Sequence, residues 1–123
     1  DGSVQLLFAA ASSDDPVIPV IERLVADFPA MDIGLNVDPT IHGPNYKVCN
    51  LINAFPRAKH DIIIVCDSDI RVTPGYLTSI LAHFNNLQVG LVTSLYRTSI
   101  VHNTATAIEA TGFTAEMIPN VLV

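Results

Sequence analysis

The sequence predicts an α/β fold: an open, mainly parallel sheet with helices on both faces. Residues 4–11 (VQLLFAAA) and 62–66 (IIIVC) are nearly continuous apolar runs, as expected for strands that are covered on both sides. Segments with apolar residues at helical spacing alternate with such runs along the chain. Strand-helix alternation of this kind builds a parallel sheet. No boundary is visible, so residues 1–123 are predicted to form a single domain.

The first helix is predicted to follow residues 4–11. Pro16 suits the first helical position, and Asp15, which precedes it, is a good N-cap. The helix ends at Pro29. Its apolar stripe recurs at helical spacing, at Val17, Ile21, Leu24 and Phe28.

The next elements are a strand, a loop and a helix. Residues 32–37 (DIGLNV) alternate in polarity and predict a short strand. Residues 38–45 contain two prolines and a glycine and predict a loop. Residues 46–55 have an apolar face and predict an amphipathic helix, which Pro56 ends.

The second half of the chain repeats the alternation. Residues 62–66 are predicted to form a buried parallel strand. Thr73 and Pro74 then read as an N-cap and a first-turn proline, before a stripe of Leu77, Ile80, Leu81 and Phe84. Residues 89–96 predict a fourth strand, and part of 103–119 predicts a helix.

Composition excludes several functions. Half of the 123 residues are hydrophobic and 15% are charged, which is typical of a packed globular domain. The net charge of −6 argues against nucleic-acid binding. No apolar run reaches the roughly 18 to 20 residues that a membrane-spanning helix needs.

Polar residues follow each predicted strand, where ligands of parallel sheets bind. They are Asp14 and Asp15 after the first strand, His42 and Asn45 after the second, Asp67 and Asp69 after the third, and Tyr96 and Arg97 after the fourth. These residues define the predicted site.

Asp67 and Asp69 are the strongest metal candidates. Two carboxylates at positions i and i+2 after a rigid strand suit Mg²⁺ or Mn²⁺, which often takes one or two protein carboxylates plus substrate phosphates. Such a metal would neutralise a leaving diphosphate. The alternative is that one of these aspartates caps a turn before Thr73.

The other candidates also have structural alternatives. Asp15 either only caps a helix or also accepts hydrogen bonds from a nucleoside. Asn45 and Lys47 lie at a helix start that could hold phosphate or sugar oxygens, or they belong to an ordinary loop-to-helix junction. The four histidines share no spacing, and we expect structural roles for them.

A phospho-accepting receiver domain is a rival interpretation. It shares paired acids after the first strand, an aspartate after the third and a threonine, Thr93, in the fourth. A receiver also needs a lysine after a fifth strand, and no lysine follows Lys59. The sequence therefore disfavours a receiver domain.

Several segments together resemble ceramide glucosyltransferases. Residues 8–18 (FAAASSDDPVI) are similar to the first acidic motif of that family, and residues 43–51 (GPNYKVCNL) to its G-x-N-x-K-x-x-N-L segment. Residues 60–72 (HDIIIVCDSDIRV) resemble its second acidic motif, and residues 89–93 the strand that follows. Order and spacing agree over roughly residues 5–97. The family includes bacterial relatives, among them hopanoid-pathway glycosyltransferases.

The resemblance implies a partial GT-A fold, which binds nucleotide-diphospho-sugars, and inverting transfer from a UDP-sugar to a lipid hydroxyl such as that of ceramide or a hopanoid. By position, Asp14 or Asp15 would contact uridine, and Asp67 the donor ribose or the metal. Asp69 would bind the divalent metal and the diphosphate. Asn45 and Lys47 match the asparagine and the lysine of the G-x-N-x-K-x-x-N-L segment and are assigned to the donor side.

The chain also departs from the family pattern. A strand before Val4 is absent, and the third acidic motif, which would supply the general base, lies beyond Val123, as do the Q-x-x-R-W motif and the membrane helices. We therefore expect an incomplete catalytic domain that is soluble and inactive alone. The intact enzyme would be membrane-associated, with this domain in the cytoplasm. The missing strand leaves an edge where a second copy could pair. The alternative is a non-catalytic binding module of the same fold.

Overall fold

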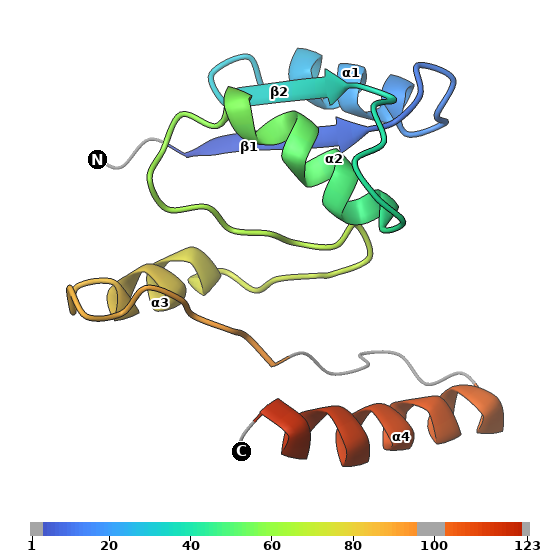
Figure 1. Cartoon of the computed structure of the whole chain (residues 1–123), viewed down its shortest axis with the longest axis vertical. Coiled ribbons are helices and arrows are strands. Elements are labelled where there is room, and N and C mark those ends of the chain that lie inside the picture. Colours follow the sequence, from blue (N-terminus) through green and yellow to red (C-terminus); the bar gives the residue numbers. More distant parts are fainter. Residues whose placement is uncertain (1–3, 96–102, 122–123) are drawn as a thin grey trace. The chain divides into compact units, whose positions relative to one another are not determined.

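The computed structural model describes residues 4–95 and 103–121 (Figure 1). Its elements are β1 (Gln5–Ala10), α1 (Ile18–Asp27), β2 (Asp32–Val37), α2 (Tyr46–Ala54), the 3₁₀ helix η1 (Phe55–Arg57), α3 (Tyr76–His83) and α4 (Thr104–Val121). The chain divides into two compact units, residues 1–68 and 69–123. The single domain over residues 1–123 stays a prediction.

The first unit contains a parallel pair of strands. β1 pairs with β2 in a register that runs from Gln5 opposite Asp32 to Ala10 opposite Val37. The backbone N–H of Asp38 donates to the carbonyl of Ala10 at 3.0 Å, which carries the pairing one residue further. The mixed α/β class and both strands of this half are therefore confirmed. A β1–α1–β2 connection of this kind also brings the carboxyl ends of both strands to one edge.

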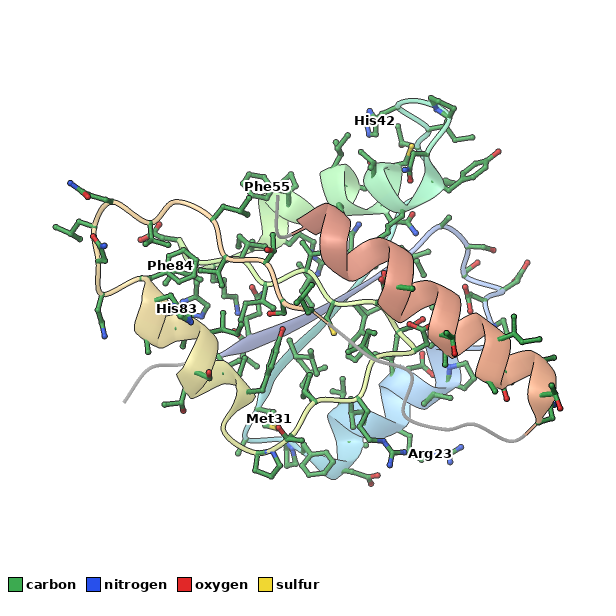
Figure 2. The ribbon with its side chains drawn as sticks, turned by 90° about the horizontal axis from the view of Figure 1, so that it is seen from below. Arg23, Met31, His42, Phe55, His83 and Phe84 are labelled. Carbon is green, nitrogen blue, oxygen red and sulfur yellow. The ribbon has the colours of Figure 1, made fainter. Side chains whose placement is uncertain are left out.

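Helices cover both faces of this pair of strands. α1 lies against one face and α2 against the other, as both views show (Figures 1 and 2). The core residues are small or aliphatic: Ile21 of α1 and Cys49 of α2 are each 3% exposed, and Ala10 and Ala54 are also buried. Full burial of an aliphatic side chain such as Ile21 stabilises the fold by about 1.5–3 kcal/mol.

The start of α1 differs from the prediction. The helix begins at Ile18 with Val17 as its N-cap, rather than at Pro16 with Asp15 as the cap. The Asp15 carboxylate instead accepts a hydrogen bond from the N–H of Val17 at 2.9 Å, and its carbonyl accepts one from Ile18 at 2.9 Å. An aspartate that bonds the N–H two residues on forms a turn of its own. That turn lies between Asp15 and the helix, which explains the shift.

η1 is anchored to both strands. The Arg57 guanidinium donates to the carbonyl of Leu35 at 2.7 Å and to the Asn36 side chain at 3.3 Å. The Arg57 carbonyl accepts from the Gln5 amide at 3.1 Å, and the Gln5 side-chain oxygen accepts from the N–H of Lys59 at 3.0 Å. These bonds satisfy polar groups of the two strands, among them the side chain of the buried Asn36. The chain after α2 is thereby fixed to the sheet.

The third and fourth predicted strands are wrong in the described structure. Residues 62–66 and 89–95 belong to no strand, and Tyr96 and Arg97 lie outside the described residues. The prediction that residues 62–66 are buried was also wrong. Four of them are 36–52% exposed: Ile62, Ile63, Ile64 and Val65. β-Branched residues favour an extended backbone, but a strand also needs a hydrogen-bonded neighbour. No described segment pairs with either run.

The second unit contains α3 and α4. The N-cap of α3 is Gly75, at φ +89°, and not Thr73. The Thr73 carbonyl accepts the N–H of Tyr76 at 3.1 Å, which closes a turn before the helix. Only glycine enters this left-handed region without steric cost, so Gly75 rather than a hydroxyl side chain sets the start of α3.

α4 confirms the helix predicted within residues 103–119. Asn103 and Thr106 form a reciprocal cap at its start: the N–H of Thr106 donates to Asn103 Oδ1 at 2.9 Å, and the N–H of Asn103 donates to Thr106 Oγ1 at 3.1 Å. Across residues 4–95 and 103–121, no helix combines the length and apolarity needed to cross a membrane.

Candidate functional site

Two loops leave the carboxyl end of the β1–β2 pair, where the sequence predicts ligand binding. The loop after β1 carries Asp14 and Asp15. The N–H of Asp14 donates to the Ser12 hydroxyl at 3.1 Å, and Asp14 is exposed. Asp15 is half-buried and accepts the Val17 N–H described above. Because β1 and β2 are parallel, these acids and the loop after β2 share one edge of the sheet.

The loop after β2 is held to α2 by one amide side chain. Asn53 donates from Nδ2 to the carbonyls of Asp38, at 3.2 Å, and Thr40, at 3.0 Å. Its Oδ1 lies 2.6 Å from Nε2 of His42, which donates to it. Figure 2 shows His42 on the loop beside α2. The structural role expected for His42 is confirmed, whereas the sequence analysis missed Asn53, whose only signal was a polar residue within an amphipathic helix.

The same loop lowers the pKa of Asp38. The Thr40 hydroxyl bonds the ionised carboxylate, and the Thr40 N–H donates to Asp38 Oδ1 at 2.9 Å. The nearby His42 acts in the same direction, while desolvation opposes these effects. Hydrogen bonds to the charged form of a carboxyl favour that form. Asp38 therefore keeps a negative charge at the end of β2 over the neutral pH range.

The loop-to-helix junction is built around Asn45 and Cys49. Asn45 caps α2, since its Oδ1 accepts the N–H of Val48 at 3.2 Å and its carbonyl accepts the N–H of Cys49 at 3.0 Å. The buried Cys49 thiol accepts the N–H of His42 at 3.3 Å and donates to the carbonyl of Gly43 at 3.5 Å. The structural alternative for Asn45 is thus present in the fold, and its assignment to the donor stays a prediction.

A small hollow lies between this loop and α2. Its volume is about 120 Å³, and its lining is His42, Gly43, Pro44, Asn45, Val48, Cys49 and Ile52. Pockets for drug-sized ligands have roughly 300–1,000 Å³. The hollow is therefore too small for a nucleotide, although it would admit a few water molecules.

Lys47 and Asp67 are brought together by the fold. Lys47 lies in the first turn of α2, and its ammonium forms an ion pair with Oδ1 of Asp67. Both side chains remain about half exposed, at 55% and 44%. A second ion pair joins Lys59 to Asp32 at 2.7 Å, at the amino end of β2, with exposures of 59% and 40%. The first pair links two residues that the sequence analysis assigned to one site.

The acidic triplet Asp67-Ser68-Asp69 follows the unpaired run of residues 62–66. Ser68 and Asp69 lie in a turn, and both aspartates are exposed. In the part of the chain that the structure describes, no three His, Cys, Asp or Glu side chains gather as a metal-binding group. A metal held by one or two protein carboxylates needs no such group. The metal assignment of Asp67 and Asp69 stays a prediction.

Comparison with known proteins decides the family. The model of Glycosyl transferase family 21 matches residues 2–123. The chain belongs to this family. The match covers nearly all of the sequence and confirms the predicted resemblance, so family 21 is favoured over the receiver alternative.

Several curated relatives of the chain are ceramide glucosyltransferases. It is 32% identical to that of Candida albicans over 92 residues, which is 67% of this chain and 17% of the relative. It is 25% identical to that of Gibberella zeae over 122 residues, which is 93% of this chain and 23% of the relative. Ceramide glucosyltransferase 3 of Caenorhabditis elegans is 31% identical over 90 residues, 72% of this chain and 20% of the relative.

The family 21 chain spans about a fifth of the length of these relatives. No solved structure matches it. The donor and metal roles of the candidate residues therefore stay predictions, which rest on sequence position. Those residues are Asp14, Asp15, Asn45, Lys47, Asp67 and Asp69.

Proposed function

We propose that this chain carries the donor and metal half of an inverting glycosyltransferase that transfers a sugar from a UDP-sugar, such as UDP-glucose, to a lipid hydroxyl. Family 21 membership supports sugar transfer, and the relatives named ceramide glucosyltransferase support a lipid acceptor and a glucosyl donor. A GT-A fold is part of the proposal, and the parallel β1–β2 pair with a helix on each face supports it.

The observation that carries the proposal is the ion pair between Lys47 and Asp67. Lys47 belongs to the G-x-N-x-K-x-x-N-L segment of the family resemblance and Asp67 to the second acidic motif, and the two residues are twenty positions apart in the sequence. Their contact supports a common site for the two motifs at the start of α2. A lysine and carboxylates at one place suit a ligand that carries both phosphate oxygens and a metal ion.

Asp67 and Asp69 would hold Mg²⁺ or Mn²⁺ in this proposal. The metal would supply neutralising charge for the diphosphate that leaves as the bond to the sugar breaks. Both carboxylates are exposed and separated by one residue, so they can serve a metal that keeps part of its coordination for substrate oxygens.

The remaining candidates would bind the donor. The Asp14 carboxylate is at the surface beside the end of β1 and can accept hydrogen bonds from the uracil or ribose of uridine. Asp15 already accepts one N–H and has further acceptor capacity. Asn45 fixes the start of α2 and thereby the position of Lys47, whose ammonium can bond a phosphate oxygen.

The acceptor half of the reaction is assigned to residues outside this chain. We place the general base, the lipid-binding residues and the membrane association there, in keeping with a chain that spans 17–23% of the relatives described above. We therefore expect this chain alone to bind donor without transferring sugar. Measurable transfer to a ceramide acceptor by the 123-residue chain would contradict that division.

Calorimetry on substituted chains tests the metal assignment. UDP is titrated into wild type, Asp69→Ala and Asp27→Ala, each with and without MnCl₂. Asp27, an exposed acid at the end of α1, is the matched control. We expect Mn²⁺ to strengthen UDP binding in wild type and Asp27→Ala, and not in Asp69→Ala. Metal-dependent binding that survives the Asp69 substitution would overturn the role of Asp69.

A further inference from the structure

The Asp67 carboxylate binds one cation in the structure and another in the proposed function. In the structure the Lys47 ammonium lies against its Oδ1 atom. In the proposed function a divalent metal takes the same carboxylate. An ammonium and a divalent cation repel each other at such close range, so they cannot both lie against Oδ1 without a cost in free energy.

We propose that Lys47 is a positioning residue that competes with the divalent metal for Asp67. When the metal binds, the Lys47 ammonium moves from Asp67 to the donor diphosphate. This inference rests on the proposed function, which assigns Asp67 to the metal. Lysine suits the role because its ammonium is a compact charge on a flexible four-carbon stem. The stem starts in the first turn of α2, so the ammonium can leave Asp67 while the helix stays in place.

The exposure of the Lys47–Asp67 pair argues against a mainly structural role for it. Both side chains are about half exposed, and exposed ion pairs contribute little to stability. Loss of Lys47 should therefore leave the fold intact. Its loss should instead change ligand affinity: the affinity for the metal alone should rise, and the affinity for UDP in the presence of metal should fall. Without Lys47 the metal alone meets no competitor at Asp67, whereas UDP in the presence of metal loses a partner for its phosphates.

Competition also couples the two ligands. A metal ion that binds alone displaces the Lys47 ammonium from Asp67 and brings no anion for it to contact. Metal that binds with a diphosphate supplies that anion at the same time. The two ligands should consequently strengthen each other in wild type, and this coupling should weaken when Lys47 is removed.

The chain provides a matched control in Lys59. The Lys59–Asp32 pair has the same chemistry and nearly the same exposures, but it lies at the amino end of β2, away from the candidate site. Lys59→Gln therefore removes an equivalent charge without touching Asp67. Lys47→Arg is the conservative variant, because it keeps the positive charge beside Asp67.

The experiment measures free Mn²⁺ by electron paramagnetic resonance, and UDP affinity at saturating Mn²⁺ by calorimetry. The chains are wild type, Lys47→Gln, Lys47→Arg, Lys59→Gln and Asp67→Asn. We expect Lys47→Gln to bind Mn²⁺ alone about two- to fivefold more tightly than wild type, the range that loss of an exposed ion pair corresponds to. It should bind UDP more weakly in Mn²⁺. Lys59→Gln should match wild type, and Lys47→Arg should restore weak Mn²⁺ binding.

The outcomes distinguish this inference from the function on which it rests. If Asp67→Asn abolishes Mn²⁺ binding while Lys47→Gln leaves it unchanged or weaker, competition is overturned and the metal site stands. If Asp67→Asn binds Mn²⁺ as wild type does, or if neither wild type nor Lys47→Gln binds it, the assignment of Asp67 fails and the competition fails with it.

Discussion

Lys47, in the first turn of α2, forms an ion pair with Asp67, which lies twenty residues further along the chain. The pair joins two sequence motifs, residues 43–51 and 60–72, that are separated by the end of α2 and by η1. Its position, rather than its free energy, gives it significance, because both side chains are about half exposed.

Asp67→Asn should affect ligand binding and not stability. Loss of a half-exposed ion pair changes the free energy of unfolding by about 1 kcal/mol or less. Asp32→Asn, which breaks the other Lys–Asp pair, should have the same small effect. Denaturant unfolding and UDP titration in Mn²⁺ measure the two properties. Equal losses of UDP affinity in both variants would show that the Lys47–Asp67 pair is not special.

Asn53→Ala should loosen the loop after β2. The substitution removes the bonds to the Asp38 and Thr40 carbonyls and to His42. At about 0.5–1.5 kcal/mol for each hydrogen bond, and with water replacing part of the loss, we expect destabilisation of about 1–2 kcal/mol. Denaturant unfolding measures it, and limited proteolysis should show faster cleavage within residues 38–45. Asn50→Ala, on the same helix, is the control, and an equal effect there would refute the role of Asn53.

Ile21→Ala should be the more damaging of two substitutions on α1. Ile21 is 3% exposed and packs between α1 and the sheet, so its truncation should cost about 2–4 kcal/mol through lost burial and a residual cavity. Val20 is 59% exposed, and Val20→Ala should change stability by about 0.5 kcal/mol or less. Denaturant midpoints compare the variants. Similar midpoints would mean that α1 does not pack on β1 and β2 as described.

Asp38 should add a pH-dependent contribution to stability. The Thr40 hydrogen bonds lower its pKa in the folded chain below the ordinary value of 3.8. A lowered folded-state pKa stabilises the fold above the unfolded-state pKa, and this contribution is lost as pH falls through the folded-state value. Wild type should therefore lose more stability than Asp38→Asn between about pH 5 and pH 2. Parallel pH profiles of thermal unfolding for the two chains would contradict this.

Local patterns predicted the elements within residues 4–57 well because their signals are short-range. Alternating or continuous apolar runs located β1 and β2 within a residue, and Pro56 marked the passage from α2 to η1. The two predicted caps, Asp15 and Thr73, failed for a different reason. Each lies in a turn that precedes its helix, and the choice between turn and helix depends on hydrogen bonds within three residues.

The two wrongly predicted strands, residues 62–66 and 89–96, have a non-local cause. The composition of residues 62–66 indicates a preference for an extended backbone but contains no information on which segment would pair with it. The contacts of the site are equally non-local. Neither the Lys47–Asp67 pair nor the three bonds of Asn53 follow from spacing, because they depend on how α2 lies against its neighbours.

The most direct test of the donor-and-metal assignment is a calorimetric titration of UDP into the wild-type chain in Mn²⁺, repeated after the metal is removed with EDTA. We predict that UDP binds in Mn²⁺ and that chelation weakens it at least about tenfold, which corresponds to about 1.4 kcal/mol. UDP affinity that is the same in Mn²⁺ and in EDTA, or no UDP binding in either, would contradict the account.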